Sequence, residues 1–197
     1  MVNPRATNED LTAKARIRNA ALDLYSQYGE DRVSLRAVAA EAGVTLGLVQ
    51  HHFKTKAGLR EAVDQLIVDY FAAAIAEVPA DGAPAEVTAA RNEAVRRMLE
   101  ENPPVVNYVR RALLEPSDSH LHLLDVLVEL TSREVGALRK SGRASTKRRE
   151  STQVVAVFAQ QMGELLLAPL VDAVWDRVAV PGDQHKPRLR VSVDAGD

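Results

Sequence analysis

The fold of the N-terminal part of this chain is decided by the stretch Ser34-Leu-Arg-Ala-Val-Ala-Ala-Glu-Ala-Gly-Val-Thr-Leu-Gly-Leu-Val-Gln-His-His-Phe53. Two helix-forming runs flank Gly43, which suits the positive φ of a tight turn, and each run follows a typical capping residue, Ser34 or Thr45. The spacing predicts one helix over 35–42 and a second one from Thr45 to about His52. Small inward side chains let the two helices cross closely, so the pattern indicates a helix-turn-helix.

Helical periodicity continues on both sides of this motif, with apolar residues every three or four positions and no alternating strand pattern or repeat. Gly29 ends a predicted helix that starts at about Asp10, and Thr55 caps one that runs to about Val78. Further helices are predicted over 85–101, 104–115, 118–140, 146–168 and 169–179, the last two separated by Pro169. We therefore expect an all-α protein with a three-helix domain that holds the helix-turn-helix in residues 1–56. A larger helical bundle follows in residues 57–180, and residues 1–9 and 181–197 are expected to be mobile.

The charge of the chain is unevenly distributed. The 197 residues carry a formal net charge of −2. Between Arg32 and Arg60, however, five basic residues stand against one acid, Glu41, which leaves a local charge of +4 and −6 for the remainder. A basic segment on an acidic body favours an anionic partner for one end only, and nucleic acid is the commonest such partner. The alternative is an ordinary solvated face.

Composition excludes several other classes. The chain has no cysteine, so disulfides, thiolate metal sites and a cysteine nucleophile are ruled out. The N-terminus is too polar for a signal peptide, and the longest apolar runs, Val154–Ala159 and Leu165–Val171, are short for a membrane span. We expect a cytoplasmic protein without membrane association, and we expect no cofactor and no metal.

The second helix of the motif supplies the candidates for DNA contact. An α-helix fits the major groove of DNA, where outward side chains meet base edges. Gln50 can pair with adenine and Leu46 can touch a thymine methyl, whereas basic side chains and helix N-termini favour phosphates. Gly47 lets the backbone approach closely. The candidate DNA-binding residues are Ser34, Arg36, Thr45, Leu46, Gly47, Leu48, Gln50, His51, His52, Lys54 and Lys56.

Two rival interpretations concern metal binding and catalysis. His51 and His52 are adjacent, and a helical ligand pair needs a spacing of three or four with further ligands nearby, so a metal site is disfavoured. Outside the motif no catalytic constellation is visible. An all-helical enzyme, with a site lined by Tyr108, His120 or Glu164, would leave the basic segment without a role.

Residues 11–60 resemble the DNA-binding domain of the tetracycline-repressor (TetR) family of bacterial regulators. The resemblance lies in Leu-Tyr-Ser-Gln-Tyr-Gly (24–29), Val-Ser-Leu-Arg-Ala-Val-Ala-Ala-Glu-Ala-Gly-Val-Thr (33–45), Gly47, His52-Phe53, Lys56 and Leu59. It implies that His52 and Lys56 lie at the DNA backbone. Family members usually carry a phosphate-binding tyrosine at the position of Gln50, so Gln50 either reads a base or replaces that phosphate contact.

The C-terminal stretch 154–178 holds too many apolar residues for one stripe on a surface helix, so two of its faces must be covered. It forms either the most buried helix of a monomer or a self-association surface. The resemblance implies the second case, with dimers joined by a four-helix bundle of the last two long helices. The candidate interface residues are Val154, Met162, Gly163, Leu166, Leu170 and Val174.

The resemblance further implies a small-molecule pocket within the bundle. The candidate lining residues are Ile67, Phe71, Met98, Tyr108, Leu127, Phe158 and Gln161. The sequence thus predicts a homodimeric, ligand-responsive repressor that binds a palindromic operator in double-stranded DNA and is not an enzyme. The alternative within the same class is a DNA-binding regulator without an effector.

Overall fold

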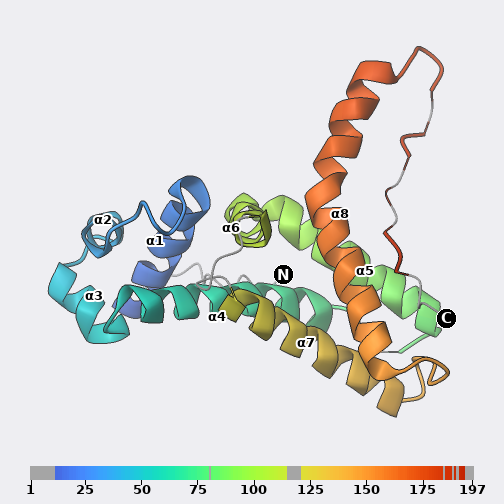
Figure 1. The fold of residues 1–197 in the computed structure, drawn as a ribbon, viewed down its shortest axis with the longest axis horizontal. Helices are drawn as coiled ribbons and strands as arrows, with labels where there is room; N and C mark the ends of the chain where they lie inside the picture. Colours follow the sequence, from blue (N-terminus) through green and yellow to red (C-terminus); the bar gives the residue numbers. More distant parts are fainter. Residues whose placement is uncertain are drawn as a thin grey trace. The chain divides into compact units, whose positions relative to one another are not determined.

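The computed structural model describes residues 12–79, 81–114, 121–183, 185–187, 189 and 191–193. Over these residues the chain is helical and contains no strand, which confirms the all-α fold class (Figure 1). The helices are α1 (Ala13–Tyr28), α2 (Leu35–Glu41), α3 (Leu46–Phe53), α4 (Lys56–Ala76), α5 (Pro84–Glu101), α6 (Pro103–Leu114), α7 (Leu121–Lys140) and α8 (Glu150–Val178). The chain divides into two compact units, Met1–Leu130 and Thr131–Asp197, with the division inside α7.

Helices α1, α2 and α3 form a three-helix head at the N-terminal end of the first unit. The side chain of Thr12 caps α1 by accepting a hydrogen bond from the Ala15 N–H, and Gly29, with φ of 84°, ends the helix. The predicted start at Asp10 lies outside the described residues. Gly43 takes φ of 64° between α2 and α3, as expected for the turn of the helix-turn-helix.

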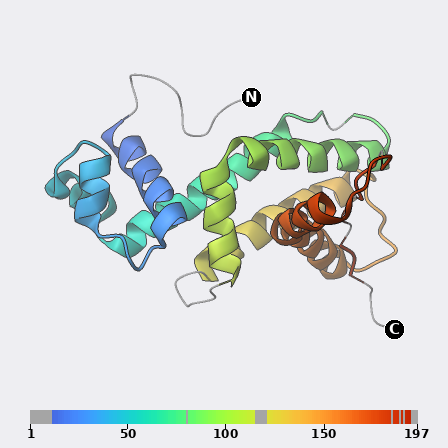
Figure 2. The same ribbon diagram turned by 90° about the horizontal axis from the view of Figure 1, so that it is seen from above.

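The remaining helices of the first unit extend from this head. Figure 2 shows α4 leaving the head and running beside α5. The start of α4 packs against α1 and α3, while α6 returns to pack against α1. The buried residues of α4 include Leu59 and Val63 near the head and Ile67 and Phe71 further along the helix. Helix α4 therefore physically connects the head to the rest of the unit.

The second unit contains the end of α7, a loop and α8. Arg139 ties the loop down because its guanidinium donates to the carbonyl oxygens of Ser145 and Arg148, at 3.1 and 3.0 Å, and to Gln153 Oε1 at 2.6 Å. Helix α8 begins at Glu150, after this held loop, and not at residue 146 as predicted.

The predicted break at Pro169 is wrong, because α8 continues through this residue as one helix of 29 residues. A proline removes one backbone hydrogen bond, but turns already formed on both sides can propagate across that gap in a long helix. The predicted end of α6 at residue 115 and start of α7 at residue 118 lie outside the described residues.

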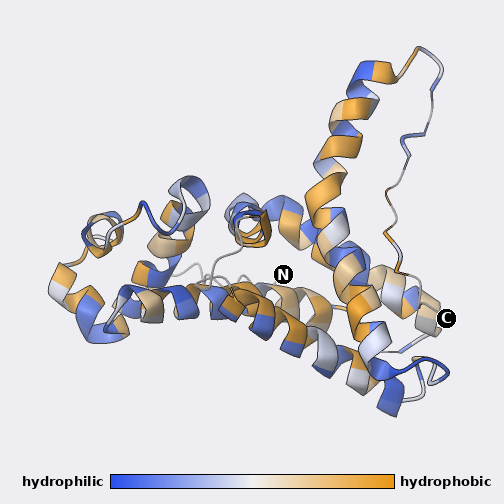
Figure 3. Cartoon of the chain, viewed as in Figure 1, coloured by the Kyte–Doolittle hydropathy of each residue, from blue (hydrophilic) through white to orange (hydrophobic). Residues whose placement is uncertain are grey.

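The continuity of α8 also corrects the expectation that no segment is long enough to cross a membrane. Its two short apolar runs join into one helix, and by length and composition alone this helix could span a bilayer. Only 11% of its most apolar stretch is buried within the described structure. Figure 3 shows apolar residues on successive turns of α8.

The described residues after α8 turn back along it within the second unit (Figure 1). Lys186 forms an ion pair with Asp172 of α8. A Cβ built on Gly163 would lie 2.7 Å from Val191 Cγ2, so the C-terminal segment packs on α8 where a glycine leaves room. The mobility predicted for residues 181–197 stays a prediction, and residues 1–9 lie outside the described part.

Candidate nucleic-acid interface

Helix α3 presents one buried and one open face. Val49 and Phe53 are buried in the head, together with Val38 and Ala39 of α2. Gln50 and His51 lie on the opposite, exposed side. The amphipathic helix is therefore fixed by its apolar face and leaves its polar side chains free to contact a partner.

All the residues predicted to contact DNA are at least partly accessible. The exposed ones are Ser34, Arg36, Thr45, Gly47, Gln50, His51 and Lys54, and the half-buried ones are Leu46, Leu48, His52 and Lys56. Their assignment to DNA stays a prediction. What the structure shows is that every member of the set is at least partly accessible and lies on, or directly beside, α2, α3 or the start of α4.

Side-chain caps order three helix starts on this surface. Ser34 Oγ accepts from the Ala37 N–H at 3.1 Å, and Thr45 Oγ1 accepts from the Leu48 N–H at 3.3 Å. Thr55 Oγ1 caps α4 in the same way, accepting from the Gly58 N–H at 3.0 Å. Helix starts carry free backbone N–H groups and the positive end of the helix dipole, which favour phosphate oxygens.

The connection between α3 and α4 is a tight turn at Lys54. The Thr55 N–H donates to the Phe53 carbonyl oxygen at 2.7 Å, and Lys54 between them has φ of 62° and ψ of −58°. These angles are those of a classic γ-turn, a rare and strained conformation. A Cβ on Gly58 would lie 2.4 Å from the same Phe53 oxygen, so this turn requires glycine at that position. Lys54 is the one positive-φ residue other than glycine in the described part.

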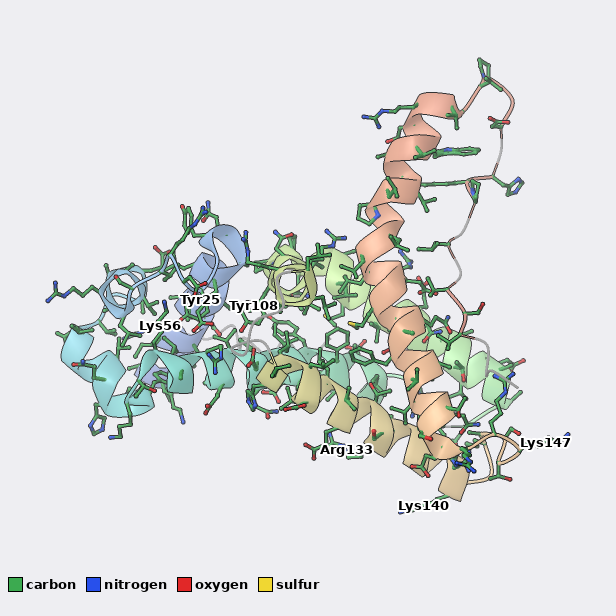
Figure 4. All side chains as sticks on the ribbon, viewed as in Figure 1. Tyr25, Lys56, Tyr108, Arg133, Lys140 and Lys147 are labelled. Atoms are coloured by element: carbon green, nitrogen blue, oxygen red, sulfur yellow. The ribbon has the colours of Figure 1, made fainter. Side chains whose placement is uncertain are left out.

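Fewer basic side chains are accessible in and beside the head than the local charge of +4 predicts. Arg60 does not belong to the open basic surface, because its guanidinium lies 3.7 Å from Glu30 and both side chains are largely buried. Glu30 lies two positions before Arg32, and so it falls outside the segment that carries the local charge of +4. Of the five basic residues in the counted segment, the ones that remain accessible without such a partner among the described residues are Arg32, Arg36, Lys54 and Lys56 (Figure 4 labels Lys56), and Lys14 of α1 adds an exposed ammonium 5.9 Å from the Phe53 ring.

His51 and His52 lie side by side, with ring centroids 5.3 Å apart in an edge-on arrangement. His52 also approaches Phe53 edge-on, at 6.2 Å. Within the described residues, no group of three or more His, Cys, Asp or Glu side chains is arranged to hold a metal ion.

A buried polar junction behind the head is missing from the sequence predictions. Asp64 of α4 is fully buried, and its Oδ1 accepts a hydrogen bond from the Tyr108 hydroxyl of α6 at 2.7 Å. Desolvation raises the pKa of Asp64 to about 6, and the hydrogen bond from Tyr108 offsets part of that rise. Burial also raises the pKa of Tyr25 in α1 well above its ordinary value. The sequence contained a signal for this junction, because Asp64 precedes Ile67 by three positions and Phe71 by seven, a spacing that places the acid on the apolar face of α4.

The predicted effector-binding residues divide between the two units. Ile67, Phe71, Met98, Tyr108 and Leu127 are buried in the first unit, whereas Phe158 and Gln161 are half-buried in α8 of the second. The Tyr108 hydroxyl is engaged by Asp64. This set stays a prediction.

The predicted interface residues all lie on α8, but they do not share one environment. Leu170 and Val174 are 60% and 49% exposed, Val154 and Leu166 are half-buried, Met162 is buried and Gly163 lies under Val191. Three large apolar residues of α8 outside the predicted set, Val155, Leu167 and Val178, are also exposed. Leu167, Leu170, Val174 and Val178 follow one another at spacings of three and four, so they form one apolar stripe.

Comparison with known proteins agrees with this architecture. Residues 17–63 match the family of bacterial regulatory proteins described as the tetR family. The chain is 50% identical over 60 residues to the HTH-type transcriptional regulatory protein RaaS of Mycobacterium tuberculosis, a match that covers 30% of this chain and only 28% of RaaS.

Two solved structures share the fold over nearly the whole chain. The multidrug binding protein EbrR, solved with imidazole, is 26% identical, with a TM-score of 0.60 over 92% of this chain and 96% of EbrR. A TetR-family transcriptional regulator from Haemophilus influenzae is 18% identical, with a TM-score of 0.62 over 85% of this chain and 91% of that protein. The helix-turn-helix of α2 and α3 therefore lies in a segment that matches the tetR family of bacterial regulatory proteins, and the helices that follow it share the fold of TetR-family transcriptional regulators.

Proposed function

We propose that this regulator is a ligand-responsive repressor that binds a palindromic DNA operator as a homodimer, acts in the cytoplasm and is not an enzyme. The observation that carries the DNA-binding part is the open face of α3, where Gln50 and His51 are exposed between capped helix starts. In this arrangement α3 enters the major groove, and Lys54 and Lys56 approach the phosphates beside it.

The apolar stripe of α8 supports the homodimer. Four apolar residues of this stripe, Leu167, Leu170, Val174 and Val178, are 44–62% exposed, which is unusual for a face turned permanently to water. A membrane would also cover this helix, but Glu164, Asp172 and Asp176 would then carry carboxylates into or near the bilayer at a substantial cost. Pairing with a second copy buries the stripe and leaves these acids in water.

A small-molecule effector is supported by the relation to EbrR, which is described as a multidrug binding protein. In our proposal the effector binds among the apolar residues predicted from the sequence and moves α4, the helix that connects the head to the body. Moving α4 in both subunits changes the spacing of the two α3 helices and releases the operator. By linkage, operator DNA must weaken effector binding by the same factor.

Selection of bound duplexes from a random DNA pool tests the DNA-binding part. We expect a palindrome whose half-sites are separated by about one helical turn or a multiple of it. Replacing Gln50, His51 and Lys56 together by alanine should abolish selection, while replacing the exposed Glu61 and Gln65 of α4 should leave it intact. Operator affinity that survives the triple replacement would refute the assignment of α3.

The homodimer and the small-molecule effector have separate tests. Sedimentation of the Leu170→Glu/Val174→Glu variant should show monomers where the unchanged chain forms dimers. In a thermal-shift screen against a metabolite panel, a specific effector stabilises the protein by RT ln(1 + [L]/Kd). A complete absence of shifts, with DNA binding retained, would favour a regulator without an effector.

A further inference from the structure

A buried polar pair joins the helix that carries the head to α6. Asp64 and Tyr108 are 44 residues apart in sequence, and their hydrogen bond of 2.7 Å connects α4 with α6. Their side chains are almost completely excluded from solvent, with exposures of 0% and 5% for the two residues. The second carboxylate oxygen, Asp64 Oδ2, is buried and has no hydrogen-bond partner among the described residues. Buried carboxylates normally accept several hydrogen bonds or face a cation, so this one is incompletely compensated.

Among the residues that the structure describes, no positive charge is dedicated to Asp64. Besides Tyr108, the groups that act on it electrostatically are Arg60 on α4, Glu30 after α1 and His122 on α7. Arg60 is shared with Glu30 at 3.7 Å, and Glu30 itself opposes ionisation of Asp64. The remaining buried residues of the packed helices α3 and α5 are apolar: Val49, Phe53, Val87, Ala94, Val95 and Met98.

A further polar group at this junction comes from α1. The Tyr25 hydroxyl is buried without a hydrogen-bond partner among the described residues and acts electrostatically on Tyr108. Figure 4 places Tyr25 and Tyr108 at the same junction. Helix α6 also touches the end of α1, because a Cβ on Gly29 would lie 3.5 Å from the Arg111 side chain. Helix α6 thus contacts the end of α1 through Arg111, and its Tyr108 is hydrogen-bonded to the buried acid of α4.

The proton affinity of this pair follows from its burial. Desolvation raises the pKa of Asp64 from 3.8 to about 6, so the folded chain holds a proton that the unfolded chain has already released between these pH values. Burial and the neighbouring Asp64 raise the pKa of Tyr108, so its hydroxyl keeps its proton and stays a donor. The buried link between α6 and α4 at Asp64 and Tyr108 is therefore favoured at acidic pH and loses stability as the pH rises through this window.

We propose that Asp64 and Tyr108 form a proton-linked clasp that holds α6 against α4 when Asp64 is neutral and loosens when Asp64 ionises. An ionised Asp64 is better solvated in any arrangement that admits water, and movement of α6 away from α4 is such an arrangement because it removes Tyr108 from Asp64. The clasp is a property of the first unit alone. Its consequence for DNA binding rests on the proposed function.

Unfolding in urea between pH 4.5 and 7.5 tests the clasp. Asp64→Asn keeps an oxygen that accepts from Tyr108 but cannot ionise, and the matched control is Glu61→Gln at an exposed site of the same helix. Over this range the unfolding equilibrium constant of the unchanged chain should rise about 30-fold more than that of Asp64→Asn. Glu61→Gln should follow the unchanged chain. Parallel curves for Asp64→Asn and the unchanged chain would overturn the proposal.

Direct titration covers the case in which Asp64→Asn does not fold. The carboxyl ¹³C shift of Asp64 in the unchanged chain should titrate near pH 6, and a midpoint near 4 would overturn the proposal. Tyr108→Phe removes the hydrogen bond that favours the carboxylate, so its Asp64 should titrate at still higher pH. A lower midpoint in Tyr108→Phe would equally contradict the clasp.

Two further measurements locate the effect. Hydrogen exchange, corrected for intrinsic rates, should show that α4 and α6 amides lose protection between pH 5.5 and 7.5 in the unchanged chain but not in Asp64→Asn. Equal losses in both would overturn the clasp.

Affinity for a duplex recovered by selection should depend on pH differently in the unchanged chain and in Asp64→Asn, and identical dependence would refute the link to DNA binding. Failure to recover any duplex would instead refute the proposed function.

Discussion

Replacing Lys54 separates its backbone conformation from its charge. Lys54 occupies a γ-turn with φ of 62°, a region in which a side chain costs roughly 1–2 kcal/mol relative to glycine. Glycine in turn lowers stability by about 0.4–1 kcal/mol through the entropy of the unfolded chain. The expected net result is that Lys54→Gly is more stable than Lys54→Ala by about 1 kcal/mol, or roughly 2–4 °C in Tm for a chain of this size.

The same two variants should be equally defective with DNA. Both lose one positive charge per subunit at the edge of α3, where Lys54 is exposed. Loss of one phosphate contact lowers the slope of log K against log salt concentration by about 0.9 per subunit. Lys54→Arg should keep the slope. The strained lysine is thus expected to reduce stability while it increases DNA affinity.

Urea unfolding and a salt titration of operator affinity measure these two effects. If Lys54→Gly proves no more stable than Lys54→Ala, the strain argument is wrong. If the salt slope is unchanged in both variants, Lys54 does not contact a phosphate, and its conformation then has no functional explanation in this surface.

Four further substitutions, at three positions, test individual features of the head. Thr45→Ala should lose about 1 kcal/mol of unfolding free energy with the cap of α3, whereas Thr45→Asp should keep the cap yet bind DNA more weakly through repulsion of phosphate. Gly47→Ala should stabilise α3 by about 0.5–1 kcal/mol, since a Cβ there meets no atom closer than 4.0 Å, but should reduce operator affinity if DNA approaches this backbone. Tyr25→Phe should leave stability unchanged or raise it, as judged by urea unfolding, because the buried hydroxyl makes no hydrogen bond among the described residues. A marked loss would show that this hydroxyl is satisfied by an ordered water.

The helix-turn-helix was predictable because its signals are local. Ser34, Thr45 and Thr55 each cap the helix that follows, and Gly43 supplies the positive φ of the turn. Capping and turn conformation depend on residues within three or four positions, so they can be identified from the sequence. Inward and outward positions of α3 follow from the period of the helix in the same way.

Two of the expectations that proved wrong, at Pro169 and Arg60, depend on interactions beyond the residue and its nearest neighbours in sequence. Pro169 was expected to end a helix, but the local loss of one hydrogen bond did not outweigh the turns on both sides. Arg60 was counted as part of the basic segment, although Glu30 draws it into the junction behind the head. A charge count cannot show which neighbour a side chain reaches, because that depends on how the end of α1 is placed beside α4.

By itself, the sequence determined the helical class, the position of the helix-turn-helix and the accessible face of α3, since periodicity and capping are properties of short segments. Only the tertiary structure placed Asp64 of α4 against Tyr108 of α6, and turned the C-terminal segment back so that Val191 covers Gly163. Contacts between residues 28 and 44 positions apart depend on helix packing, which no local pattern specifies. The charge state of Asp64 likewise depends on desolvation by surrounding helices, so it is a property of the packed molecule.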